Sequence, residues 1–125
     1  MLRMYVIPDS DIWESFFAEE NIEFEELLER GEILVSPIIF AELKGSKSID
    51  NKTLQVLKQL PQVPNFEQSA LSAVVSKNKL KQFGLAAPQT EMLATAIALK
   101  AKVWTHNRSF RTIATVFGLC FIERD

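Results

Sequence analysis

Apolar positions follow two different spacings along the chain, and their alternation predicts an α/β fold. Short uninterrupted apolar runs predict buried strands at residues 3–7, 33–35, 103–104 and 119–122. Between these runs, apolar residues recur at helical spacing, with Ser, Asp, Asn or Pro where several helices begin and Gly where several end. The pattern predicts seven helices, near residues 12–17, 22–30, 37–44, 50–60, 65–83, 88–100 and 107–117.

Strands of this kind, separated by helices, are typical of a parallel sheet that is covered on both faces. We therefore expect an α/β protein with three layers, α/β/α, around a central mainly parallel sheet of 4–5 strands. The 125 residues correspond to a single domain, residues 1–125. Sites in such sheets lie at the carboxyl ends of the strands.

Composition removes several classes of protein. With 47% apolar and 24% charged residues, the chain is neither disordered nor a coiled coil. Its one cysteine, Cys120, excludes a disulfide framework and a cysteine-based zinc site, and we expect it in the core. No apolar run approaches the ~20 residues that span a bilayer, and acidic residues follow the start too soon for a signal peptide. We expect a soluble cytoplasmic protein that does not bind membranes.

The net charge of −2 conceals an uneven distribution. Residues 1–32 hold ten acids and two bases, a net charge of −8, whereas residues 33–125 hold six acids and twelve bases, a net charge of +6. A polyanionic partner is therefore compatible with the sequence, because local charge decides such binding. The acids are equally explained as the solvated face of one helical hairpin.

Acidic and amide side chains stand where the predicted strands end or on helix faces that should be covered. Asp9 and Asp11 follow the first strand, Glu42 and Glu91 lie on the third and sixth helices, and Asn107 follows the strand at 103–104. Carboxylates gathered without counter-charge repel one another, and a hard divalent cation such as Mg²⁺ relieves that repulsion. The pattern favours metal-assisted phosphodiester hydrolysis, although each acid is also explained as a helix cap or surface charge.

The motifs around these side chains resemble those of PIN-domain nucleases. They comprise a strand followed by Asp-Ser (residues 6–13), a helix with Glu-Leu and a nearby Gly (35–45), an acid opening an Ala-rich helix (91–99), and Thr-x-Asn-x-x-Phe after a strand (103–110). All four occur in the family order and together extend over nearly the whole chain. Length and compactness are similar to those of VapC-like toxins of toxin–antitoxin pairs.

The resemblance implies a Mg²⁺- or Mn²⁺-dependent endoribonuclease that acts on RNA, forms a homodimer and is silenced by a small antitoxin protein. It assigns catalysis to Asp9, Glu42, Glu91 and Asn107, with the three acids as metal ligands. Two positions depart from the family pattern, because Glu91 and Asn107 stand where Asp is common.

Further side chains near these motifs are candidates for contact with the substrate, each with a structural explanation that is equally good. They are Ser10, Asp11, Lys44, Lys47, Thr105, Arg108 and Arg111. Basic residues among them would hold RNA phosphates, and that binding would weaken as salt rises. His106, the only histidine, is expected to be an exposed loop residue, and both tryptophans, Trp13 and Trp104, are expected in the core.

Other functions remain open at this point. The main alternative is a catalytically impaired PIN-like module that binds RNA or protein, which the two departures motivate. A phosphorelay receiver is less favoured, because the only mid-chain Asp, Asp50, does not follow an apolar run. A dinucleotide-binding domain would need a Gly-rich loop after the first strand, and the sequence has none. Residues 11–30 combine apolar and acidic side chains, and we expect this hairpin at a homodimer or antitoxin interface.

Overall fold

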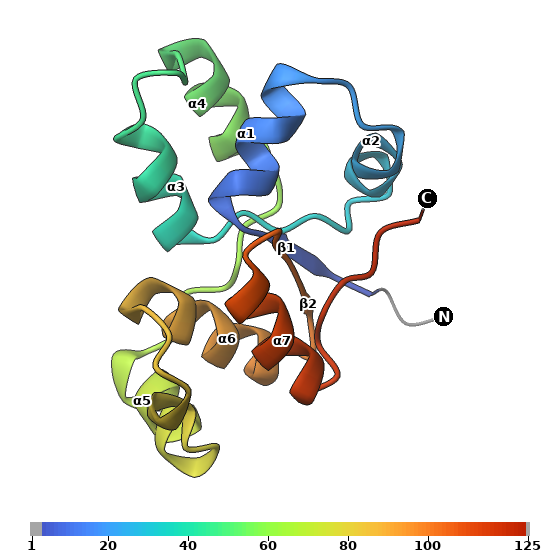
Figure 1. The fold of residues 1–125 in the computed structure, drawn as a ribbon. Coiled ribbons are helices and arrows are strands. Elements are labelled where there is room, and N and C mark those ends of the chain that lie inside the picture. The colour runs from blue at the N-terminus through green and yellow to red at the C-terminus, as the bar shows by residue number, and fades with distance from the viewer. Residues whose placement is uncertain (1–3, 125) are drawn as a thin grey trace.

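Two parallel strands lie at the centre of the molecule, with helices on either side (Figure 1). The computed structural model describes residues 4–124, and Arg3 of the predicted first strand lies outside them. Most helices were predicted correctly to within a few residues. In chain order the elements are β1 (Val6–Pro8), α1 (Ser10–Ala18), α2 (Ile22–Glu29), α3 (Pro37–Lys44), α4 (Asn51–Gln59), α5 (Gln68–Lys77), η1 (Leu80–Phe83), α6 (Ala87–Leu99), β2 (Lys102–Trp104) and α7 (Arg108–Val116).

The strand pair is shorter and narrower than the predicted sheet. β1 and β2 run parallel, with Ile7 opposite Val103. Three further segments each add one parallel bridge, Val6 with Ile33, Val35 with Gln62, and Val103 with Cys120. The parallel arrangement is confirmed, but the sheet of 4–5 strands is not, because only two strands form within residues 4–124.

The sequence explains part of this difference. Pro61 and Pro64 flank the segment at Gln62 and Val63, and proline has no N–H to continue a ladder. Pairing there is limited to Val35 N–H on the Pro61 carbonyl and Val63 N–H on the Val35 carbonyl, each at 2.9 Å. The predicted strands at 33–35 and 119–122 are extended segments, each of which pairs with β1 or β2 through a single bridge.

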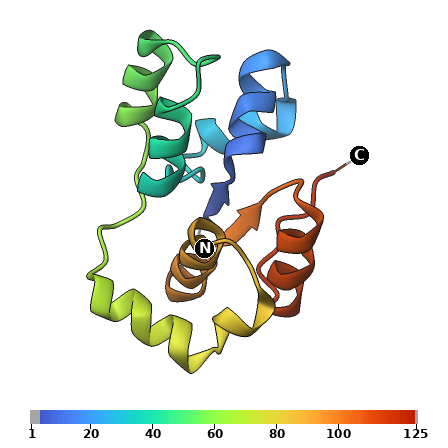
Figure 2. The same cartoon turned by 60° about the vertical axis from the view of Figure 1, so that its left-hand side comes forward.

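Helices α1–α4 lie on one side of the strand pair, and α5–α7 lie on the other (Figure 2). Their apolar faces meet in a core whose largest fully buried members include Trp13, Phe24, Trp104 and Phe110. The rings of Trp13 and Phe24 pack edge to face at 5.0 Å, and Phe24 lies 5.4 Å from Trp104. This aromatic cluster joins α1 and α2 to β2, and it confirms both tryptophans as core residues. Cys120 is half-buried and packs against the same core.

The long helix predicted over residues 65–83 is wrong at both ends. Its first part, α5, begins only at Gln68 and ends at Lys77. Lys79 then adopts a left-handed conformation with φ of 52°, and a short 3-10 helix follows. At the end of α5, the backbone N–H and the side-chain amide of Asn78 both donate to the Val74 carbonyl, at 3.1 and 2.9 Å.

Polar side chains cap several helices as their sequence positions predict. Asp50 accepts from the Thr53 N–H at the start of α4, and Asn107 accepts from the Phe110 N–H at the start of α7. After α2, Gly31 has φ of 69°, a conformation that glycine adopts without strain. None of the helices described within residues 4–124 has the length and apolar character needed to cross a membrane.

Candidate functional site

Asp9 stands at the carboxyl end of β1 and is fixed there by contacts with the end of β2. Its backbone N–H donates to the Trp104 carbonyl at 2.8 Å. One carboxylate oxygen, Oδ1, accepts from the Ser10 N–H at 2.8 Å, which makes Asp9 the N-cap of α1. The other oxygen, Oδ2, accepts from the buried Thr105 hydroxyl at 2.9 Å. Both strand ends therefore hold this one carboxylate in place.

Asp11 lies next to Asp9 in the first turn of α1 and is held by the same loop after β2. Its Oδ2 accepts from the His106 N–H at 2.9 Å. Its Oδ1 is buried and has no hydrogen-bond partner within residues 4–124. A buried carboxylate oxygen without a donor is costly, and a cation or an ordered water would satisfy it.

The carboxylates influence one another electrostatically. Burial raises the pKa of Asp9 above its ordinary value, and the negative charges of Asp11 and Glu42 raise it further. Hydrogen bonds from the Ser10 N–H and the Thr105 hydroxyl act in the opposite direction but do not cancel the increase. The negative charges of Asp11 and Glu42 thus act on Asp9, and carboxylate oxygens are ligands of the kind that Mg²⁺ or Mn²⁺ prefers.

Glu42 and Glu91 approach this region from α3 and α6. Glu42 is exposed and lies one turn beyond Ile38, so the two share a face of α3. Glu91 lines a cavity of about 200 Å³ together with Ser36 and Ile38. Glu91 therefore faces the first turn of α3, and Glu42 lies one turn further along the same helix.

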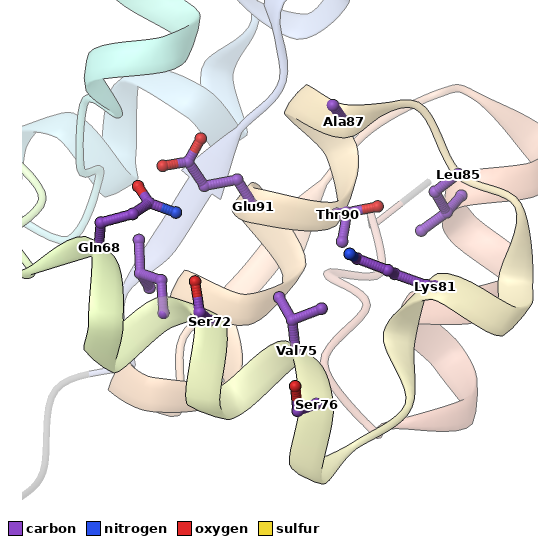
Figure 3. Close-up of a pocket in the computed structure, with 10 residues that line it drawn as sticks. Gln68, Ser72, Val75, Ser76, Lys81, Leu85, Ala87, Thr90 and Glu91 are labelled. Carbon is purple, nitrogen blue, oxygen red and sulfur yellow. The ribbon is translucent and has the colours of Figure 1, made fainter.

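Glu91 also forms one end of a second, larger cavity between α5 and α6. This cavity has a volume of about 490 Å³, and Leu71 and Val75 of α5 contribute apolar lining. Figure 3 shows the Glu91 carboxylate beside Gln68 at one end and Lys81 toward the other.

Within the part of the chain that the structure describes, no three His, Cys, Asp or Glu side chains lie close enough together to hold one metal ion. Asp9 and Asp11 are adjacent, Glu42 acts on Asp9 through its charge, and Glu91 faces the neighbouring cavity. The assignment of Asp9, Glu42 and Glu91 as metal ligands stays a prediction.

Asn107 caps the start of α7, as its position in the sequence predicts. Its side-chain oxygen accepts from the Phe110 N–H at 3.0 Å and caps α7, while its own N–H donates to the Thr105 hydroxyl at 3.1 Å. Its side chain is exposed, so the amide nitrogen is accessible to solvent. A role for Asn107 in catalysis stays a prediction beside this observed capping.

Of the remaining candidates for substrate contact, two are bonded to Asp9 and two are exposed on helices. Ser10 is half-buried behind Asp9, and Thr105 is buried and bonded to it. Lys44 and Arg108 are exposed on α3 and α7. Direct contact with a substrate stays a prediction for all of these residues.

A further group of polar contacts beside the site was not predicted. His106 is exposed, as expected, but its Nε2 lies 2.6 Å from Glu123 Oε1. The same Glu123 oxygen accepts from the Trp104 indole N–H at 2.5 Å. No acidic residue lies between Glu91 and Glu123 in the sequence, and this is the one sequence feature that could have drawn attention to Glu123.

Comparisons with solved structures identify the fold. A chain of the VapBC-1 structure from nontypeable Haemophilus influenzae superposes with a TM-score of 0.69 at 18% identity, over 96% of this chain and 98% of that one. A chain of VapBC2 from Rickettsia felis, bound to a DNA fragment from its promoter, gives a TM-score of 0.64 at 19% identity, over 98% and 100%.

The chain has the fold of these VapBC structures. The resemblance to VapC-like proteins inferred from the motifs is confirmed at the level of the fold. No protein-family model matches the sequence, and a search of curated proteins finds no match.

Neutralising Asp9 is expected to stabilise the metal-free protein at neutral pH. Because the folded-state pKa of Asp9 is raised, the folded protein loses stability as pH rises above about 3.8 and Asp9 ionises. Asp9→Asn should therefore increase Tm by a few degrees at pH 7 in a chelating buffer, and by progressively less toward pH 4. Thermal unfolding followed by circular dichroism at several pH values measures this difference.

Asp50→Asn provides the matched control. Asp50 also caps a helix, but hydrogen bonds from Thr53 lower its pKa, so its ionised form is favoured in the folded protein. Its replacement should not increase Tm at pH 7. An equal increase in both variants would show that the effect is unrelated to the charge around Asp9.

Proposed function

We propose that this protein is a metal-dependent endoribonuclease, the toxin of a toxin–antitoxin module. The observation that carries the proposal is the Asp9–Asp11 pair, where two adjacent carboxylates are held at the strand ends and one oxygen is buried without a partner. The VapBC fold and the four motifs support the same function.

In this proposal Asp9, Glu42 and Glu91 hold a Mg²⁺ or Mn²⁺ ion. When bound, such an ion activates a water molecule and neutralises charge on the phosphoryl group during hydrolysis. The chain's own contribution is to fix the carboxylates before the substrate arrives. Thr105 and the Ser10 N–H orient Asp9, and the His106 N–H orients Asp11.

The buried Oδ1 of Asp11 is the acceptor that these contacts leave free. It can accept a hydrogen bond from a water molecule beside Asp9, and it adds one negative charge to the site. Asn107 contributes no charge, but its exposed amide group can donate to a phosphate oxygen while its carbonyl oxygen caps α7.

A second candidate function is a catalytically impaired module that binds RNA or protein. It is favoured by the separation of the acids within residues 4–124, which do not converge on one point. An RNA-cleavage assay distinguishes the two functions, because an impaired module would bind RNA without hydrolysing it.

RNA hydrolysis should require Mg²⁺ or Mn²⁺ and should stop when a chelator is added. Asp9→Asn should lower the rate at least about a hundredfold, since it removes a charged ligand at the reacting group. Cleavage of a single-stranded RNA, followed by gel electrophoresis, measures both effects. Asp50→Asn, which changes an acid on α4, should retain the full rate. Activity that survives excess chelator would exclude the metal mechanism.

Asn107→Asp should increase the affinity for Mn²⁺ by up to about tenfold. An added carboxylate strengthens attraction to a dication, although part of the gain is lost to the cost of desolvating it. Asp also caps helices well, so α7 should persist. Calorimetric titration of Mn²⁺ into both forms measures the change. Unchanged affinity for Mn²⁺ with an altered Tm would show that Asn107 caps α7 and does not contribute to metal binding.

The hairpin α1–α2 is proposed as part of the surface that meets an antitoxin or a second copy of the chain. The structure places Phe24 and Leu27 in the core, with Phe16 stacked on Phe24 at 4.3 Å. The apolar surface left for a partner is therefore smaller than the sequence indicated, and includes Phe17 at 37% exposure and Ile22 at 66%.

Replacing Ile22 by Lys should weaken that interface without unfolding the protein, because the side chain is largely exposed. Sedimentation of the chain alone, and after co-expression with the product of the adjacent gene, measures assembly. Val56→Lys on α4 is the matched control, since Val56 is also exposed, at 54%. A strict monomer that forms no complex would contradict the proposed interface.

A further inference from the structure

An open cleft of about 680 Å³ runs along α7 and the loop before it. Its lining residues are His106, Arg108, Arg111, Thr112, Thr115 and Val116. The cleft adjoins the carboxylate site directly, because the backbone N–H of His106 holds Asp11. The cleft therefore begins at a residue whose backbone contacts the carboxylate site.

The cleft is positively charged, whereas the adjoining site is negative. Arg108 and Arg111 make no ion pair within 4.0 Å among the described residues, whereas Arg30 and Arg124 are each paired with glutamates. A guanidinium group keeps its charge at all accessible pH values and binds phosphate through two parallel hydrogen bonds. Both arginines are therefore available to an anionic ligand.

The spacing of the lining residues places four of them on one face of α7. Arg108, Arg111, Thr112 and Thr115 stand at i, i+3, i+4 and i+7 and share one face of α7. They extend over roughly 10 Å of the helix axis. The threonine hydroxyls donate to the carbonyls of Arg108 and Arg111, at 2.9 and 2.7 Å, so their hydrogens are not available to a ligand. The two arginines are therefore the donors that an anionic ligand would meet on this face.

We propose that this cleft binds the phosphodiester backbone of the RNA strand on one side of the bond that is cleaved. The proposal rests on the proposed function and assigns part of its substrate path. A polyanion is repelled by the carboxylates around Asp9, so a row of cations beside them is needed to hold it there. RNA is favoured over an acidic protein segment because the cleft shares His106 with the carboxylate site, where the proposed hydrolysis of a phosphodiester takes place.

Glu123 opposes this binding from the edge of the cleft. Its Oε1 accepts from His106 and from Trp104, and its charge also acts on Arg111. A phosphate entering near His106 meets this carboxylate. Glu123 therefore limits the affinity of the cleft, and its neutral analogue glutamine keeps an oxygen that can accept the same hydrogen bonds.

Binding is measured apart from cleavage in the Asp9→Asn background. Fluorescence anisotropy with a labelled single-stranded RNA, repeated at several salt concentrations, gives both the affinity and its salt dependence. Arg108→Gln and Arg111→Gln should each weaken binding about three- to tenfold and reduce the slope of log K against log salt by about 0.7. Glu123→Gln should strengthen binding by a similar factor.

Lys52→Gln serves as the control, because Lys52 is exposed on α4, across the strand pair from α7. Its effect should be clearly smaller than that of either arginine variant. Equal effects in all three variants would overturn the proposal and leave only diffuse attraction. Preference for a polyglutamate peptide over RNA, with the same dependence on Arg111, would also overturn it and assign the cleft to an acidic protein partner.

The outcomes separate this inference from the proposed function. Cleavage by the native chain together with unaltered binding in the arginine variants would refute the RNA-binding role of the cleft and leave the proposed nuclease activity in place. RNA binding that depends on Arg108 and Arg111 in a chain that hydrolyses no RNA would support the RNA-binding role of the cleft and refute the proposed nuclease activity. Thermal unfolding of each variant confirms that the changes in binding occur in folded protein.

Discussion

The hydrogen bond from the Thr105 hydroxyl to Asp9 is the contact on which the candidate site depends. It joins residues that are 96 positions apart, at the carboxyl ends of two neighbouring parallel strands. The bond from the His106 N–H to Asp11 reinforces it, one residue further along the loop after β2 and two residues further along the segment after β1. Together with the bond from the Ser10 N–H to Asp9, these contacts hold two carboxylates near each other although their charges repel.

The same short loop after β2 carries several functions at once. Thr105 orients an acid, His106 holds a second acid and contacts Glu123, and Asn107 starts α7. Such concentration follows from parallel topology, since loops at the carboxyl ends of adjacent strands are brought together. A substitution in this loop therefore affects charge, local geometry and the beginning of a helix together.

Sequence patterns predicted the elements whose ends have distinctive chemistry. Ser36 before Pro37 marked the start of α3, and Asn107 marked that of α7. The break after α5 escaped prediction because residues 66–83 contain neither Gly nor Pro, and the left-handed turn at Lys79 has no signature in residue type. The extent of the sheet was overestimated, because an apolar run predicts burial but does not determine how many bonds a neighbouring segment offers.

For the site, position after a strand was enough to single out Asp9, Asp11 and Asn107. The bond from the His106 backbone to Asp11 was not foreseeable, because every residue except proline has an N–H and its partner depends on the assembled fold. Glu123 escaped for a related reason, since its partners Trp104 and His106 are distant in sequence.

The separation of 96 residues between Asp9 and Thr105 also has a consequence for synthesis on the ribosome. Contacts this distant in sequence form only after the second partner has left the ribosome, and closing so long a loop delays them further. A nascent or truncated chain that ends before β2 contains Asp9, Asp11, Glu42 and Glu91 but lacks the groups that hold the first two in place. Whatever chemistry the assembled site performs, the polypeptide acquires it only after β2 and the loop that follows it have been translated.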